Sequence, residues 1–454
     1  MRKQIYLGLI LLATVPAWPQ AASDAPKNEA AAGSNVDANV QDRMLTPPPV
    51  SGEAYPVGLD SEEHSNYLHY GLTFSSSYSD NVLGTTGGHP ASDISYSVWP
   101  TIGVDETTSR LHWGLTYAPG FTFYQRTSAR NESDQNALLS FQYRLSPHVS
   151  FSAHDSLQRS SSVFNQPGLA SGFVYGGAQG PNESVVAPIA DRLNNFGDLA
   201  ITYQYSGNNM VGAGGSFTNL HYPSAAQVPG LFDNSSQTGT AFYSHRLSQR
   251  HYVGVTYQYQ RLVSYPGGLN NETQTHAAFF FYTVYPSPRL SISFFGGPQY
   301  ADTAQPAVAS LQIPEFFSRN WAPAGGASLN WQGRLTSVAL SYSHSVSEGG
   351  GLFTAVRLDH ASASIRQQFT RTLNGSVSGF YGNNILLGAA PFTNNGHTLA
   401  ATAALERKVG QHLSLQLGYT RLHQTYNIPL IAGAPDTNRE FISLSYDFAR
   451  PLGR

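Results

Sequence analysis

The sequence contains no cysteine, carries little charge and has no long apolar run beyond its first residues. The absence of cysteine excludes disulfides, thiolate metal sites, thiol catalysis and lipoprotein modification. Charged residues make up 12% of the chain, about half of the roughly 25% that is typical of globular domains. A formal net charge of −3 argues against a broadly nucleic-acid-binding surface. A membrane-spanning helix needs about 20 apolar residues, and no such run follows residue 22.

The first residues have the layout of a secretory signal peptide. Met1-Arg2-Lys3 is a short basic segment, and Ile5–Val15 is apolar. Small residues follow, and the apolar run is too short for an ordinary spanning helix. Val15-Pro16-Ala17 fits a cleavage site, and Ala21-Ala22 offers a second. We predict a signal peptide over residues 1–22, with a membrane-anchoring helix as the alternative.

The next segment, residues 23–65, is rich in Ala, Pro, Asn and Ser and shows no periodicity. Such a composition buries too little apolar surface to fold by itself. We predict a flexible periplasmic leader. A segment that contacts a partner or peptidoglycan is the alternative.

From about residue 66 to residue 450 the chain alternates between apolar and polar side chains. Period-two alternation predicts strands with one apolar and one polar face. The clearest strand places Leu139, Phe141, Tyr143 and Leu145 on one face and Ser140, Gln142 and Arg144 on the other. After the turn Ser146–His148, Val149 and Phe151 resume the apolar face.

Turn signals divide this region into about eighteen strands. The short connections are predicted at Asp105–Ser109, Ser146–His148, Gly207–Asn209, Ser248–Arg250, Pro286–Pro288, Gln332–Gly333, Thr370–Thr372 and Gly410–Gln411. Longer segments lie between them, the largest being Ser160–Asn194, Pro223–Ser236 and Asp302–Ser318. Short turns on one side and long loops on the other are typical of outer-membrane barrels.

The polar faces decide between a soluble sandwich and a membrane barrel. In the strand Leu111–Arg126, the outward positions are Leu111, Trp113, Leu115, Tyr117, Phe121 and Phe123, and the inward ones are His112, Gly114, Thr116, Ala118, Gly120, Thr122, Tyr124 and Arg126. Small and polar inward residues suit a hydrated interior rather than a core. We therefore predict an all-β protein: a closed antiparallel transmembrane β-barrel of about 18 strands, with 16–18 as the range, over residues 66–450.

A barrel of this size leaves an aqueous channel. The leader is too short and too irregular to be a separate plug domain, which argues against a TonB-dependent receptor. Ser160–Asn194 is the only loop long enough to constrict the channel persuasively, and its Gly and Pro content fits an external loop equally well. Both readings stay open.

Few charges are predicted to face the lumen. Arg126, Arg366 and Glu406 are candidates for contacting solutes or for tuning selectivity, and Tyr124 offers an inward aromatic ring. Arg144, Glu406 and Asp447 are expected near the periplasmic rim, where a solvated structural role is favoured over contact with solutes. The last strand, Phe441–Phe448, ends on an aromatic residue, and Tyr446 and Phe448 fit the C-terminal signal read by the barrel-insertion machinery. Ala449–Arg454 is expected to be a short tail, because Pro451 stops a strand.

One segment invites a catalytic reading. Ser341–Gly351 (SYSHSVSEGGG) places His344 near Ser345, Ser347 and Glu348, and loosely resembles the His/Ser region of outer-membrane phospholipase, where a base activates the nucleophile on the outer wall. Its spacing matches no defined motif, and Gly349-Gly350-Gly351 is interpreted as the turn of an external loop. No metal-binding spacing occurs among the histidines. We predict no enzyme activity, catalytic residue, cofactor or metal.

Tyr78–Asn81, Ser97–Pro100 and the SYSHSVSEGGG segment lie on the first, second and thirteenth predicted strands. Residues 67–448 together resemble the β-barrel porins of Gram-negative bacteria, some of which are linked to exopolysaccharide export. The resemblance implies an outer-membrane location and a pore, and supplies no binding residues. The leading hypothesis is a channel for passive diffusion of small hydrophilic solutes. The alternatives are an outer-membrane component of exopolysaccharide export or surface assembly and, less favoured, a lipid hydrolase. Expected partners are outer-membrane lipid, the barrel-insertion machinery and solutes or polysaccharide, with a homo-oligomer left open.

Overall fold

The computed structural model describes residues 66–84, 90–161, 182, 184–185, 190–223, 230–266, 270–307, 315–387, 395–426 and 436–451. The predicted signal peptide and leader lie outside these ranges. The described residues form one short 3₁₀ turn, η1 (Ser128–Arg130), and strands. The strands are β1 (Tyr67–Ser79), β2 (Asp93–Thr107), β3 (Leu111–Tyr124), β4 (Glu132–Ser146), β5 (Val149–Ser160), β6 (Arg192–Ser206), β7 (Asn209–His221), β8 (Asn234–Ser248), β9 (His251–Ser264), β10 (Asn271–Ser287), β11 (Leu290–Gln305), β12 (Phe316–Gln332), β13 (Thr336–Glu348), β14 (Ala355–Gln368), β15 (Leu373–Leu386), β16 (Asn395–Val409), β17 (Leu413–Thr425) and β18 (Asp436–Pro451).

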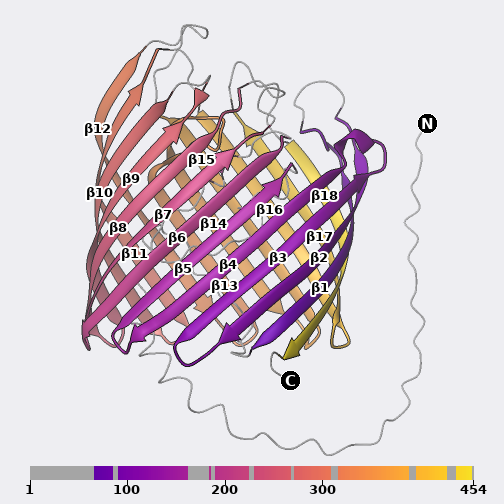
Figure 1. Ribbon diagram of the computed structural model, residues 1–454, viewed down its shortest axis with the longest axis horizontal. Helices are drawn as coiled ribbons and strands as arrows, with labels where there is room; N and C mark the ends of the chain where they lie inside the picture. The colour runs from indigo at the N-terminus through magenta and orange to yellow at the C-terminus, as the bar shows by residue number, and fades with distance from the viewer. Residues whose placement is uncertain are drawn as a thin grey trace, which may run out of the picture.

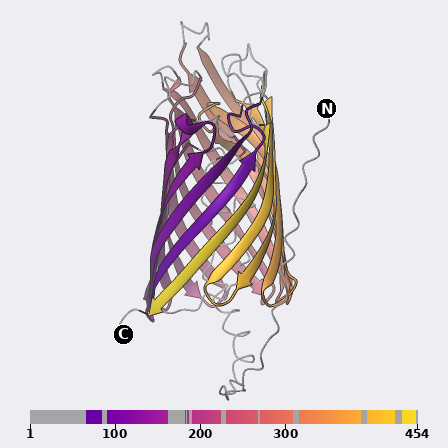
Figure 2. The same ribbon diagram turned by 90° about the vertical axis from the view of Figure 1, so that its right-hand side faces the viewer.

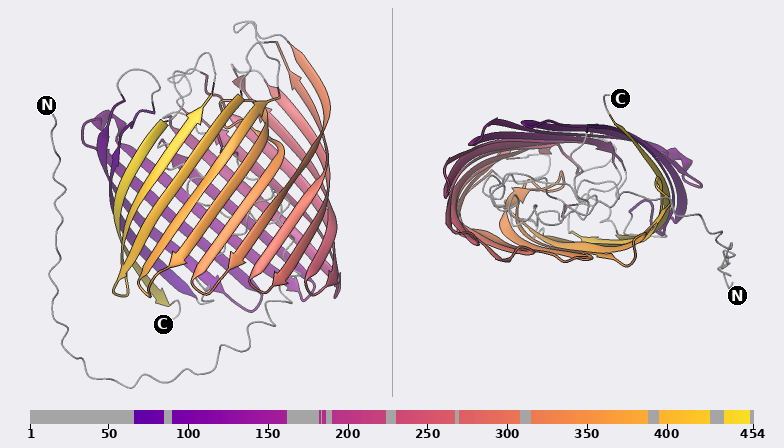
Figure 3. Two further views of the ribbon diagram at one scale, coloured as in Figure 1. Left: turned by 180° about the vertical axis from the view of Figure 1, so that it is seen from behind. Right: turned by 90° about the horizontal axis from the view of Figure 1, so that it is seen from below.

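These strands form one 18-stranded antiparallel sheet in which each strand pairs with its neighbours in sequence. The sheet closes because β1 also pairs with β18, from Tyr67↔Pro451 to Ser79↔Arg439. The predicted closed barrel of about 18 strands is confirmed. The barrel is wide in Figure 1 and narrow in Figure 2, and the view from below in Figure 3 shows an oval ring with β8–β12 toward one narrow end and β17, β18, β1 and β2 toward the other.

The connections alternate in length as predicted. Those at one end of the barrel contain two to four residues, and those at the other end contain six or more. The C-terminal strand finishes at the short-turn end (Figure 1). Among the described residues, no helix is long and apolar enough to cross a membrane.

The ladder between β12 and β13 differs from the others. It runs only from Gly325↔His344 to Gln332↔Ser337 at the short-turn end, although β12 extends to Phe316 and β13 to Glu348. Above His344, the amide of Val346 donates to the side-chain oxygen of Gln299 on β11, at 3.2 Å. The upper part of β13 therefore leaves the wall at β12 and lies against the inner face of β11.

The expected tail after Phe448 is wrong in part, because β18 continues to Pro451, opposite Tyr67 of β1. Pro451 is the last residue of its strand, where the missing N–H costs the ladder least. Proline also occurs within the wall. Pro298 of β11 and Pro323 of β12 face each other directly, so both missing donors fall on one rung of the ladder.

Candidate functional site: the lumen and its constriction

The outer and inner faces of the wall differ in chemistry as the sequence predicts. Outward positions around the ring expose large apolar side chains, among them Phe74, Phe123, Leu199, Val255, Phe280, Leu340 and Leu417. Apolar residues in such numbers on the outside of a closed barrel form the belt that faces lipid. The inward positions next to them carry Ser, Thr, Asn and Gln, most of which are buried.

The inner wall is lined by pairs of hydroxyl groups from neighbouring strands. Their Oγ atoms lie 2.7–3.1 Å apart in Ser77–Ser95, Ser97–Thr122, Thr73–Ser445, Thr283–Ser293, Ser341–Ser362 and Thr402–Thr420. Each hydroxyl can donate and accept, and its hydrogen rotates to suit its partner. The pairs satisfy one another across the strands, so these inward positions are polar without carrying charge.

Aromatic rings on the inner wall lie over glycines of the neighbouring strand. Trp99 covers Gly120, Phe281 covers Gly254 and Phe441 covers Gly418, since a Cβ added at each glycine would collide with the ring. Phe242 over Gly212 and Phe295 over Gly326 repeat the arrangement. A glycine under a ring lets that ring lie close against the strand.

These rings have different surroundings at the two narrow ends of the oval. At the packed end, which we define as β9–β12, Phe279, Phe281 and Phe295 are 3–8% exposed and pack with Ala277 and Ala324. The rings of Phe279 and Phe295 meet edge to face at 5.4 Å. At the hydroxyl-lined end, which we define as β17, β18 and β1–β3, Trp99 and Phe441 are only half-buried.

The connection between β13 and β14 folds into the lumen. The hydroxyl of Tyr222, just after β7, donates to the carbonyl of Gly350 at 3.0 Å, and the amide of Phe232, just before β8, donates to that of Gly351 at 3.1 Å. Strands β9–β12 lie between β8 and β13 in the ring. These contacts therefore bridge the interior, and we call residues Val346–Val356 the inward tip.

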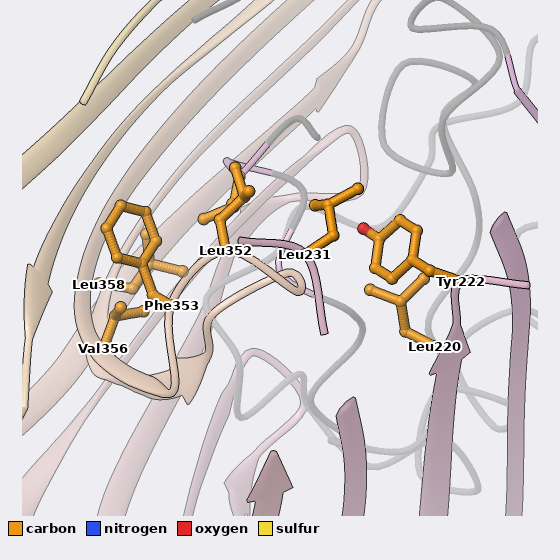
Figure 4. Close-up of a cluster of buried hydrophobic side chains, with 8 residues drawn as sticks. Leu220, Tyr222, Leu231, Leu352, Phe353, Val356 and Leu358 are labelled. Carbon is orange, nitrogen blue, oxygen red and sulfur yellow. The ribbon is translucent and has the colours of Figure 1, made fainter. Parts of the chain in front are cut away.

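An apolar cluster holds the inward tip in place (Figure 4). Leu352, Phe353 and Val356 come from the tip, and Leu220, Tyr222, Leu231, Val185 and Leu358 complete the cluster at 8% exposure or less. In Figure 4, Leu231 and Leu352 lie between the Tyr222 ring on one side and Phe353 on the other. Burying a side chain of this size stabilises a structure by about 1.5–3 kcal/mol. The cluster is therefore a firm constriction of the lumen.

A buried polar network attaches part of the predicted long loop to the inward tip. The side-chain amide of Asn182 donates to the carbonyl of Glu348 at 2.7 Å and to the side-chain oxygen of Asn384 at 3.0 Å. The side-chain amide of Asn384 donates to the Ser184 hydroxyl at 2.9 Å. Most of Ser160–Asn194 lies outside the described residues, but Asn182, Ser184 and Val185 are buried in the constriction.

The expectation that Gly349-Gly350-Gly351 forms an external turn is wrong. Gly350 and Gly351 have φ of +60° and +84°, a region that L side chains rarely adopt. A Cβ on Gly351 would also collide with the Tyr222 ring. The three glycines make a tight reversal inside the barrel because Leu352 and Phe353 need apolar partners, which the walls supply.

The residues proposed for the lumen lie in separate places. Tyr124 is half-buried on the inner face, where its hydroxyl donates to Glu132 at 3.3 Å. Arg126 lies beyond the end of β3 with an exposed side chain, and its backbone amide donates to the Asp93 carboxylate at 3.1 Å. The structure does not bring these two together with Arg366 or Glu406.

Arg366 and Glu406 lie on inward positions near the short-turn end. Arg366 stands opposite Ser337 and Ser376, and Glu406 opposite Asn374 and Gln416. Both side chains are half-buried. They belong to different strands, β14 and β16, and form no ion pair with each other among the described residues.

A charged cluster that the sequence reasoning missed surrounds Tyr124. Asp134 is completely buried on β4, two residues from Glu132. Arg192 of β6 and Arg439 of β18 both interact electrostatically with these two carboxylates. Two cations against two anions satisfy the rule that buried charges are paired. The sequence offered one clue, because the acidic residues Glu132 and Asp134 occupy inward positions of the same strand.

His344 is not placed to activate a serine. Its Nδ1 lies 2.6 Å from Oδ1 of Asp359, and the Tyr342 hydroxyl donates to the same carboxylate at 3.1 Å. Tyr342 is 47% exposed on the outer face, which His344 shares by alternation. Ser345 and Ser347 point to the other face. The described residues contain no group of three or more His, Asp or Glu that could hold a metal ion.

The Tyr78–Asn81 segment closes the barrel at its long-loop end. The Asp80 carboxylate accepts hydrogen bonds from the amide of Asn438 at 2.7 Å and from its side chain at 2.5 Å, and the Asn81 side chain donates to the carbonyl of Asp436 at 3.0 Å. Burial by itself raises the pKa of Asp80, but these hydrogen bonds outweigh it and hold the pKa below its ordinary value.

At the other end of the same seam, Tyr446 and Phe448 are exposed on the outer face. The ring of His412 lies 6.0 Å from Tyr446 and 5.7 Å from Phe448. Both aromatic residues pair with the first strand, opposite Leu72 and Tyr70.

No family model and no curated protein matches this sequence. Solved structures match its fold. The vanillate complex of Pseudomonas aeruginosa OpdK is 11% identical with a TM-score of 0.41, over 84% of this chain and 99% of that one. P. aeruginosa OccK2 (OpdF) is 9% identical with a TM-score of 0.41, over 85% and 98%. Acinetobacter baumannii OccAB4 is 10% identical with a TM-score of 0.41, over 86% and 100%. These values transfer no residue roles, and the barrel described above rests on this chain's own strand pairing.

Proposed function

We propose that the protein is an outer-membrane channel for passive diffusion of small hydrophilic solutes. The observation that carries this proposal is the closed 18-stranded barrel, with an apolar outer face and hydroxyl-lined inner face. A closed barrel leaves no backbone group unpaired in hydrocarbon, and a ring of 16–18 strands is wide enough to hold water.

The inward tip sets the width of the proposed passage. It bridges the lumen between β13–β14 and the ends of β7 and β8, so solutes pass beside the cluster around Leu352 and Phe353 rather than through a fully open ring. A narrowed bore favours small solutes over polymers. Within the described ranges, no arrangement favours polysaccharide export or lipid hydrolysis.

The experiment for this proposal is electrical. The purified, folded barrel is inserted into planar bilayers in potassium chloride solution and the current is recorded at fixed voltages. Steady openings with a linear current–voltage relation are expected. A folded barrel, verified by its heat-modifiable migration on gels, that conducts no ions contradicts the proposal.

The untested segments fit this proposal. We propose that residues 1–22 are a cleaved signal peptide, that residues 23–65 are a periplasmic leader, and that Tyr446 and Phe448 are read by the barrel-insertion machinery. N-terminal sequencing of the mature protein tests the first point. Outer-membrane yield of a Phe448→Ala variant, compared with a Phe369→Ala variant at an exposed turn residue, tests the last.

A further inference from the structure

The structural role of the two half-buried rings at the hydroxyl-lined end is less evident than that of the rings at the packed end. Trp99 and Phe441 are inward residues that lie over Gly120 and Gly418, and both stay half-buried rather than fully buried, so that part of each ring is accessible from the lumen. Phe279 and Phe295, by contrast, use their rings to pack against each other. A flat ring held against a channel wall presents a π-face, which attracts weakly positive C–H groups.

The two rings lie on β2 and β18, with β1 between these strands. Trp99 stands opposite Thr73 of β1, and Phe441 stands opposite Ser77 of the same strand. With about 3.3 Å per residue and about 4.8 Å between strands, the two rings are roughly 16 Å apart, and Phe441 is nearer the long-loop end. A solute that moves along this wall meets them one after the other.

Hydroxyl groups flank the ring of Trp99. Ser97 and Thr122 pair at 2.8 Å on the adjoining inward positions, and Thr73, directly opposite Trp99, pairs with Ser445 at 2.9 Å. A hydroxyl both donates and accepts hydrogen bonds, so this surface matches a ligand whose own groups are hydroxyls. The hydroxyl pairs themselves carry no charge, and the charged cluster approaches this surface at the completely buried Asp134, which stands opposite Gly120 on β4.

Phe441 differs from Trp99 in one respect. The Arg439 guanidinium lies over its ring, 6.0 Å from the centroid, so that a cation already shares this π-face. Trp99 is therefore the better binding position for an uncharged ligand, and Phe441 with Arg439 forms the next position along the wall.

We propose that Trp99, seated on Gly120 and flanked by the Ser97–Thr122 and Thr73–Ser445 hydroxyl pairs, is a binding subsite for saccharides in the lumen. The C–H face of a pyranose ring lies on the indole, and the sugar hydroxyls exchange hydrogen bonds with the partly exposed Thr73 and Ser445 hydroxyls, while the buried Ser97–Thr122 pair supports the strand beneath. This inference rests on the proposed channel function and names its substrate class.

The test uses current block in planar bilayers with the full-length barrel. Maltotriose is the probe, sorbitol is a polyol control without a ring face, and benzoate is an aromatic control without sugar hydroxyls. Maltotriose is expected to reduce the current through the wild-type channel in a saturable way, whereas sorbitol and benzoate do not. Trp99→Ala is expected to weaken the block about tenfold or more.

Two variants serve as controls. Tyr96→Ala removes an aromatic ring from the outer face of the same strand, where Tyr96 is 50% exposed, and should leave the maltotriose block unchanged. Trp99→Phe keeps a flat ring on Gly120, preserves folding if Trp99→Ala does not fold, and should give an intermediate block.

The outcomes are distinct. A folded barrel without any current contradicts the channel itself. Current without a saturable maltotriose block, a stronger block by benzoate, or an equal block in wild type and in the folded Trp99 variants overturns the saccharide subsite and leaves the channel intact.

Discussion

The two narrow ends of the barrel use the same local device for different purposes. At the packed end, Phe281 over Gly254 and Phe295 over Gly326 belong to a closed apolar cluster. At the hydroxyl-lined end, Trp99 over Gly120 is half-buried between hydroxyl pairs. The comparison teaches that the neighbours of a ring seated on a glycine decide its role. Where other aromatic rings surround it, the ring fills the barrel interior, and where hydroxyl groups surround it, the ring lines a passage.

The packed end is also where the wall is least regular. The β11–β12 rung between Pro298 and Pro323 lacks both N–H donors within an otherwise continuous register, and β12 loses its ladder to β13 beyond Gly325. At the hydroxyl-lined end, the ladder between β1 and β18 is unbroken, and the β2–β3 register misses only the three pairs between Val98↔Phe121 and Ile102↔Tyr117. Interior apolar packing therefore stabilises the part of the wall that has fewer backbone hydrogen bonds.

Among the variants that test this comparison, Phe281→Ala is expected to destabilise the barrel most. Phe281 is 3% exposed, and removing a buried phenylalanine side chain costs about 3–5 kcal/mol. The urea midpoint of unfolding, followed by heat-modifiable migration, should fall strongly. Phe280→Ala is the matched control on the same strand, since Phe280 is 57% exposed on the outer face. Equal shifts in the two variants would contradict a packed interior at this end.

A smaller loss is expected from Asn384→Ala, which breaks the network that joins the inward tip to β15. Asn384 is 1% exposed, and the polar groups left unpaired on Asn182 and Ser184 cost about 1–3 kcal/mol. The tip should then move more freely, seen as more frequent current fluctuations in planar bilayers. Asn383→Ala, the next residue on the same strand, faces outward and should leave the current steady. Unaltered fluctuations in a folded Asn384→Ala barrel would show that the network does not restrain the tip.

Trp99→Ala should destabilise the barrel less than Phe281→Ala does. Trp99 is half-buried, so the lost burial amounts to about 1–2 kcal/mol, below the range for fully buried aromatic residues. The measurement is the same urea midpoint. A loss as large as that of Phe281→Ala would mean that Trp99 belongs to a packed core, and the distinction between the two ends would fail.

The smallest effect on stability is expected at the junction of β1 and β18, at the hydroxyl-lined end. Hydrogen bonds from Asn438 and Thr437 hold the pKa of Asp80 below its ordinary value, against the opposing effect of burial. A carboxyl group with a lowered pKa stabilises the fold above its unfolded-state pKa, and that contribution is lost as the pH falls through the folded-state value. Asp80→Asn should lower the urea midpoint at pH 7, with a difference from wild type that begins to shrink below about pH 4, the ordinary pKa of the carboxyl group, and is lost as the pH falls through the lower folded-state pKa. A difference that persists at acidic pH would contradict this role.

The barrel itself was predictable from the sequence because its physical cause is local. Strict alternation, as in Leu139–Leu145, assigns each side chain to one face, and the turn at Ser146–His148 repeats along the chain. Strand number, closure and the faces followed from these patterns. The boundaries were less accurate, since β3 ends at Tyr124 rather than at Arg126 and β18 continues to Pro451.

A constriction was considered only for the Ser160–Asn194 loop. The part that the β13–β14 connection plays was not predicted, because it depends on contacts between distant segments. Tyr222, Leu231 and Phe353 meet only after the barrel has closed. The sequence held one clue: Val356 and Leu358 occupy inward positions of β14, where polar residues are expected. Loop length was an incomplete guide, since the six-residue connection between β13 and β14 enters the lumen together with Asn182, Ser184 and Val185 of the long Ser160–Asn194 segment.

The central claim is that the barrel conducts and that the inward tip narrows it. The most direct test compares single-channel conductance of the wild type with that of a variant in which residues 350–353 are replaced by a two-residue Asn-Gly turn. The account predicts ohmic openings in both, with conductance about twofold or more larger in the variant, because the apolar cluster no longer bridges the lumen. Equal conductance in two folded barrels would contradict the constriction, and the absence of conductance in both would contradict the channel.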